Sequence, residues 1–152
     1  MKTTAESLAP TDAVRLLMSR PPATVESDES VRSVAQELVA ADIGALLVEV
    51  PGAPTGLVSE RDVVAVVAAG GDVDVGQAGE IMTTDLIAAA PGDTIAAVGV
   101  LMRDAGVRHI PVRDDDGRWI GLVSMRERIR SVGGELRINS GPGRGSEVEV
   151  AV

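Results

Sequence analysis

Gly56–Asp62 (GLVSERD) is the stretch of sequence that decides the fold, because the chain repeats it 65 residues later as Gly121–Glu127 (GLVSMRE). Upstream of it, Ser30–Val48 (SVRSVAQELVAADIGALLV) overlays Thr94–Val112 (TIAAVGVLMRDAGVRHIPV) at an offset of 64 residues. The one-residue difference falls in a predicted hairpin loop, where insertions are tolerated. Two copies of one supersecondary unit are therefore expected.

Each copy carries the same order of predicted elements: strand, helix, strand, strand, helix. Ser30 and Thr94 are suited to cap the first helix of their copies, and apolar residues follow each at helical spacing. Turn residues separate the two later strands of each copy. The predicted elements are short strands near 23–26 and 86–89, hairpins over 45–50 with 55–59 and 109–113 with 119–124, and introductory helices near 12–18 and 77–82.

These elements predict an α/β (α+β) fold of two β-α-β-β-α repeats with pseudo-twofold symmetry, in which small mixed sheets pack against helices. A copy of about 60 residues is marginal alone, so the two repeats are expected to share a core. The predicted boundaries are a disordered N-terminus over 1–10, repeat one over 11–70, a linker over 71–75, repeat two over 76–131 and a tail over 132–152. The tail alternates like a C-terminal β-hairpin around a Gly/Pro turn, or else is frayed.

Composition excludes several classes of function. The chain has 152 residues, 45% of them apolar, and a formal charge of −9, which disfavours nucleic acid as a partner. It has no cysteine, one histidine and no long apolar run, so we predict no metal site, no membrane association and a cytoplasmic location. The acidic run Asp114–Asp116 favours a solvated turn over a metal site. We expect no catalytic residues and therefore no enzyme.

The ordered motifs resemble the CBS (cystathionine-β-synthase) domain family over Asp12–Arg130, nearly eight tenths of the chain. The resemblance rests on a Met at 18 and 82, the capped helix, the strands GALLV and RHIPV, and the GLVS repeat. It implies a paired module, often called a Bateman module, with clefts between the repeats that bind AMP, ADP, ATP or S-adenosylmethionine. It also implies a homodimer, an unknown regulated protein as partner, and no required cofactor.

Ser59 stands where a strand ends and a helix begins, a corner whose free backbone N–H groups favour an anion. Asp62 resembles the ribose-binding aspartate of the family, although Ser59 and Asp62 also suit a plain helix cap. The second copy has Ser124, Arg126 and Glu127 at these places, and Glu127 departs from the family pattern because its side chain is a methylene longer.

Other site residues follow from the resemblance. Arg108 and His109 resemble the basic pair that many members place before the second strand, with Arg61 and Arg126 as further cations for a phosphate; His109 also suits a solvated strand edge. The first repeat has no basic residue at the corresponding place. The resemblance implies an apolar slot for adenine, although these positions also suit the core: Thr24, Val25, Ile43, Ala45, Ile87, Ala88 and Ile110.

The tail GGELRINSGPGRGSEVEV resembles the C-terminal end of sensor histidine kinase ATP-binding domains. The remaining boxes of such a domain are missing from the sequence, and about twenty residues are too few for an ATPase. The sequence thus favours a regulatory module that senses an adenine nucleotide. The alternatives are a ligand-free scaffold and, less favoured, a fragment of a histidine kinase.

Overall fold

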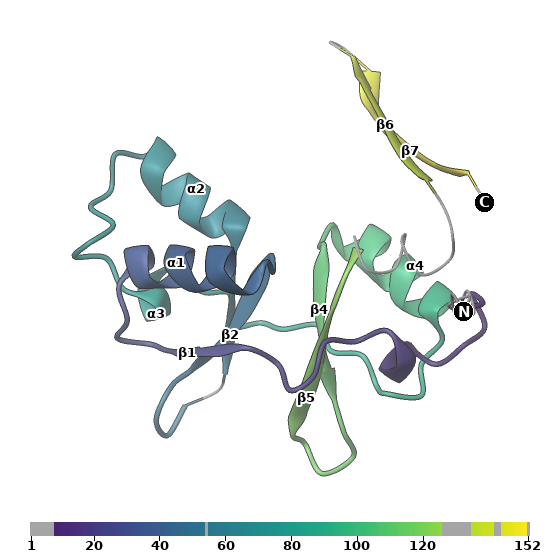
Figure 1. Cartoon of the computed structure of the whole chain (residues 1–152), viewed down its shortest axis with the longest axis horizontal. Coiled ribbons are helices and arrows are strands. Elements are labelled where there is room, and N and C mark those ends of the chain that lie inside the picture. Colours follow the sequence, from purple (N-terminus) through teal and green to yellow (C-terminus); the bar gives the residue numbers. More distant parts are fainter. Residues whose placement is uncertain (1–7, 54, 126–134, 142–143, 152) are drawn as a thin grey trace, which may run out of the picture. The chain divides into compact units, whose positions relative to one another are not determined.

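The computed structural model describes residues 8–53, 55–125, 135–141 and 144–151, and the chain forms two compact units (Figure 1). Unit 1 comprises Met1–Ser19 together with Ala89–Val152, and unit 2 comprises Arg20–Ala88. Each unit contains helices and small sheets, which confirms the predicted mixed fold.

Unit 2 holds a three-stranded sheet in the order β1-β2-β3, with helices α1 and α2 together on one side of it (Figure 1). β1 is parallel to β2, and β3 is antiparallel to β2. Ser30 Oγ accepts a 3.0 Å bond from Ser33 N, so the predicted cap of α1 is confirmed. The elements are β1 (Thr24–Glu26), α1 (Val31–Ala41), β2 (Ala45–Glu49), β3 (Gly56–Ser59), α2 (Glu60–Ala68) and α3 (Ala78–Ile81).

Unit 1 repeats this plan with a two-stranded sheet, and Thr94 caps its helix by accepting a 3.1 Å bond from Ala97 N. Its elements are η1 (Val14–Leu16), α4 (Ile95–Ala105), β4 (His109–Arg113) and β5 (Trp119–Ser124). The predicted introductory helices are both shorter than expected, a 3-10 turn in η1 and one turn in α3. Of the final helix of repeat two, only Met125 is described.

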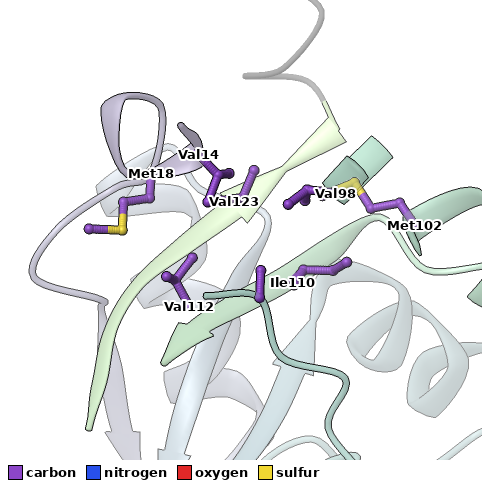
Figure 2. Packing of buried hydrophobic residues seen from close by; sticks show 8 residues of the cluster. Val14, Met18, Val98, Met102, Ile110, Val112 and Val123 are labelled. Carbon is purple, nitrogen blue, oxygen red and sulfur yellow. The ribbon is translucent and has the colours of Figure 1, made fainter. Parts of the chain in front are cut away.

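Each unit is completed by the segment that precedes the other repeat in the sequence. In unit 1, Val14 and Met18 pack against Val98, Val123 and their neighbours in one buried cluster (Figure 2). In unit 2, buried Ala78 with Ile81 and Met82 joins the core built by the first repeat. Residues 11–19 and 76–88 therefore pack with the repeat that does not contain them.

In each unit, a methionine from the segment contributed by the other repeat packs against the glycine of the GLVS strand. A Cβ at Gly121 would lie 2.5 Å from Met18 Sδ, and a Cβ at Gly56 would lie 2.8 Å from Met82 Cγ. Because glycine has no Cβ, each GLVS strand leaves space that a methionine side chain fills. This contact gives a packing reason for a residue that the motif alone leaves unexplained.

The strand expected over 86–89 is reduced to one parallel bridge between Ala89 and Val112. In unit 2 the corresponding strand is longer because Leu47 N donates a 3.0 Å bond to Ala23 O. The residue at the place of Leu47 in unit 1 is Pro111, which has no N–H to give to Ile87. A single proline therefore shortens the first strand of the second repeat.

The predicted linker 71–75 and the residue after it, Gly76, cap α1. Val31 N and Arg32 N donate to the carbonyls of Gly76 and Val73, each at 2.9 Å. The Arg32 guanidinium also pairs with the Asp74 carboxylate through two hydrogen bonds, one of them 3.0 Å from Nη2 to Oδ2. This bonding lowers the pKa of Asp74 below its ordinary value and raises that of Arg32.

The tail forms the expected β-hairpin from β6 (Glu135–Gly141) and β7 (Arg144–Ala151). The strands are antiparallel, with Glu135 opposite Ala151 and Ile138 opposite Val148. The register shifts between Asn139 and Gly141, next to the turn. The hairpin alternative of the prediction is therefore confirmed for the backbone.

Candidate ligand-binding corners

In unit 2 the start of β2 meets the end of β3 and the first turn of α2. Ala45 pairs with Ser59 across the two strands, and Glu60 N donates a 3.0 Å bond to Gly44 O. This bond brings the N-terminus of α2 beside the backbone that enters β2. We call the site formed by Gly44, Ala45, Ser59 and Asp62 the unit 2 corner.

The Asp62 carboxylate closes the helix cap with one oxygen. Oδ2 accepts a 2.8 Å bond from Ser59 N and a 3.0 Å bond from Ser59 Oγ. Within the described part of the chain, no hydrogen bond is formed by Oδ1 of Asp62, and the residue is half-buried. The capping role and a ligand-binding role are thus compatible, because each role needs only one oxygen.

The other residues expected around this corner differ in accessibility. Thr24, Arg61 and Ala88 are exposed, Ile43 is half-buried, and the Ile87 side chain is 39% exposed. Val25 and Ala45 are buried, and Val25 packs in the core of the unit. All of these residues belong to unit 2, and the exposed ones are available to a ligand where they stand.

Unit 1 contains the corresponding corner at the start of β4. His109 pairs with Ser124, and Met125 N donates a 2.9 Å bond to Arg108 O. Arg108 is exposed, His109 and Ser124 are half-buried, and Ile110 is a core residue. We call the site formed by Arg108, His109 and Ser124 the unit 1 corner. The predicted site residues Arg126 and Glu127 lie outside the described residues.

The hydrogen bonds and the strand register show which residues of the two corners correspond to each other. Gly44 O and Arg108 O accept the same kind of bond from the next helix, while Ala45 and His109 pair with the serine of each GLVS motif. The sequence did not predict the role of the Gly44 carbonyl, which accepts the bond from the first residue of α2. The signal was the offset of 64 residues, which places Gly44 opposite Arg108.

In the parts of the chain that the structure describes, no group of three acidic or histidine side chains is placed to hold a metal ion. Those same parts contain no helix of the length and apolarity that crossing a membrane requires. The side chains named in the two corners supply carboxylate, hydroxyl, guanidinium and imidazole groups.

Comparison with known proteins places the chain in a family. The family model described as the CBS domain matches residues 13–69 and 78–134. The chain therefore belongs to the CBS domain family. It is 33% identical over 117 residues to the mitochondrial CBS domain-containing protein CBSX3 of Arabidopsis thaliana, and the match covers 73% of this chain and 56% of that protein.

Solved structures agree with this assignment. The CBS domain pair of protein MJ0100, in complex with 5′-methylthioadenosine and S-adenosyl-L-methionine, matches with a TM-score of 0.72 and 26% identity over 82% of this chain and 98% of that one. The CBS domain protein PAE2072 from Pyrobaculum aerophilum, complexed with AMP, matches with a TM-score of 0.69 and 28% identity, covering 76% and 88%.

Proposed function

We propose that this chain is a regulatory module that senses an adenosine-containing ligand, of the AMP, ADP and ATP class or S-adenosylmethionine, and catalyses no reaction. The observation that carries the proposal is the Asp62 carboxylate, with one oxygen in the helix cap and the other unbonded within the described residues. A ribose diol supplies two O–H donors, and a carboxylate accepts them. Structural relatives in complex with AMP and with S-adenosylmethionine support the ligand class.

The signal of such a module is a shift in population between arrangements of the protein. A ligand favours one arrangement only by the difference between its affinities for the two. The unit 2 corner joins the N-terminus of α2 to the backbone entering β2 through the bond from Glu60 N to Gly44 O. A ligand on Asp62 therefore acts directly on the position of α2 within its unit.

Thermal unfolding of the whole chain tests the proposal. Midpoints are measured alone and with millimolar AMP, ADP, ATP or S-adenosylmethionine, because a ligand that prefers the native state raises the midpoint by mass action. At a ligand concentration of 100 times Kd the stabilisation is about 2.7 kcal/mol. We expect a rise with at least one ligand and its loss in Asp62→Ala. Unchanged midpoints with all four ligands would contradict the proposal.

A second candidate is an interaction protein whose corners stay empty, and α2 favours it. None of the nine residues of α2 is buried, and Val64 and Val67 are 65% and 62% exposed. Val39 of the neighbouring α1 is 82% exposed. We propose that this apolar face mediates a homodimer. Light scattering should show a monomer for Val64→Asp and a dimer for the matched control Val100→Asp on α4. A monomeric wild-type chain would refute the dimer.

The kinase-fragment alternative rests on the hairpin tail alone. Purified chain that hydrolyses ATP, with turnover removed by ending the chain at residue 134, would support it. We expect no turnover, because the sequence lacks the remaining boxes of such a domain and about twenty residues are too few for an ATPase.

A further inference from the structure

The net charge of the chain lies entirely on one of its two units. Residues 20–88, which form unit 2, contain twelve aspartates and glutamates and three arginines, a formal charge of −9. The remaining residues contain eleven acidic and eleven basic side chains and are neutral overall. The two related corners therefore stand in different electrostatic surroundings, one strongly negative and one neutral overall.

The local groups reinforce this difference at the unit 2 corner. Two acidic side chains, Asp42 and Glu60, are exposed next to this corner. Asp42 ends α1 two residues before Gly44, and Glu60 directly follows Ser59. Arg61 is exposed beside them, whereas Arg32 is held by Asp74. Because Gly44 and Ala45 occupy the places of Arg108 and His109, no side chain at the strand entrance brings positive charge to this corner.

The unit 1 corner has a cation at the entrance of its strand, and the unit 2 corner has none at that place. The exposed Arg108 stands at the entrance of β4, in a unit whose formal charge is zero. Arg108 forms no hydrogen bond or ion pair with any described side chain. A guanidinium in this state is a good partner for a phosphate group.

We propose that the unit 2 corner binds an adenosine derivative whose 5′ substituent is neutral or cationic, such as a thioether or a sulfonium, and that phosphate-bearing nucleotides bind at the unit 1 corner. This inference rests on the proposed function, because it assumes that Asp62 binds a ribose. It adds that charge sorts the ligands between two otherwise related sites. The sorting follows Coulomb's law, since a phosphate at the unit 2 corner meets the net negative charge of its unit, in which Arg61 stands between Glu60 and Asp62.

The sorting has a characteristic salt dependence. At physiological ionic strength the Debye length is about 8 Å, so charges on a small unit still act on a ligand at its surface. We expect AMP to bind the unit 2 corner at least tenfold more weakly than 5′-methylthioadenosine. Raising the salt concentration to about 0.5 M should narrow this ratio, because screening weakens the repulsion of the phosphate and leaves the neutral ligand unaffected.

Calorimetric titration of the whole chain tests the inference with three probes that share adenosine: 5′-methylthioadenosine, S-adenosylmethionine and AMP. Arg108→Ala should reduce AMP binding to the weak affinity of the unit 2 corner and leave the affinity for the other two ligands unchanged. Asp62→Ala should remove the binding of 5′-methylthioadenosine and S-adenosylmethionine and retain that of AMP. Arg103→Ala removes an exposed arginine of α4 outside both corners and serves as the control. The double variant Asp42→Asn with Glu60→Gln, measured in the Arg108→Ala background, should raise AMP affinity about two- to threefold and leave 5′-methylthioadenosine unchanged.

The outcomes separate the inference from the function on which it rests. AMP binding that survives Arg108→Ala, is lost in Asp62→Ala and matches the affinity of 5′-methylthioadenosine would overturn the inference and leave the proposed function intact. Failure of wild-type protein to bind any of the three probes would overturn both. Selective loss of AMP in Arg108→Ala, with retention in Arg103→Ala, supports the inference.

Discussion

Replacing Gly121 by alanine should destabilise unit 1 through a clash with the exchanged segment. The new Cβ would lie 2.5 Å from Met18 Sδ, 2.8 Å from Met18 Cγ and 3.0 Å from the backbone oxygen of Ser19. Two of these neighbours belong to a nearly buried side chain and one to the backbone, so the strand or the segment must move. Overpacking of this kind costs about 1–3 kcal/mol.

The assay is thermal unfolding followed by circular dichroism, with the midpoint compared between variants. For a chain of this size 1 kcal/mol corresponds to roughly 2–4 °C, so the midpoint of the chain should fall by about 2–12 °C. Gly92→Ala is the control, because a Cβ at Gly92 would meet nothing within 4 Å and should leave the midpoint unchanged.

A double-mutant cycle identifies Met18 as the cause. Met18→Ala alone should cost about 2–5 kcal/mol through the cavity it leaves. In that background Gly121→Ala should cost less than half of its wild-type value, because two of the three close neighbours are gone. Equal costs in both backgrounds, or a fully stable Gly121→Ala, would refute the packing of residues 11–19 in unit 1.

Three further predictions concern the backbone and the linker. Pro111→Leu should supply the missing N–H to Ile87 O, so hydrogen exchange should show a protected amide at position 111; rapid exchange there would contradict the explanation of the short strand. Asp74 has a lowered pKa because of its hydrogen bonds from Arg32, so its contribution to stability is complete above the ordinary value of 3.8 and is lost as the pH falls through the lowered one. Thermal midpoints should therefore fall less steeply below pH 4 in Asp74→Asn, and identical slopes would argue against the pair. Thr94→Ala should cost about 0.5–2 kcal/mol in chemical denaturation because the Ala97 N–H loses its cap, while Thr94→Ser should cost little.

Local signals in the sequence predicted the elements well. The caps at Ser30 and Thr94 and the GLVS strands appear where residue type and periodicity place them, because these features depend on neighbours a few residues away. The tail hairpin followed from alternation alone. The repeat itself supplied the family.

Long-range packing was less accessible to the sequence. Met18 and Met82 are found by overlaying the repeats, but no local pattern says that each lies over the glycine of the other repeat. The consequence of Pro111 was also missed, because it depends on which strand lies alongside β4.

At the candidate site, sequence reasoning supplied Ser59 and Asp62 and left the cap and the ligand as rival interpretations. The structure assigns one carboxylate oxygen to the cap, which removes the conflict between them. The full concentration of charge on unit 2 followed only from the units, because Asp72, Asp74, Glu80 and Asp85, which lie in the predicted linker and repeat two, belong to unit 2.

Chemical-shift mapping by NMR of the isotopically labelled whole chain tests the central claim most directly. Saturating 5′-methylthioadenosine should shift the backbone amides of Gly44, Ala45 and Ser59–Asp62 most, and Asp62→Ala should abolish these shifts. Shifts confined to the hairpin over 135–151, or shifts at the corner that persist in Asp62→Ala, would contradict a ligand site built on that carboxylate.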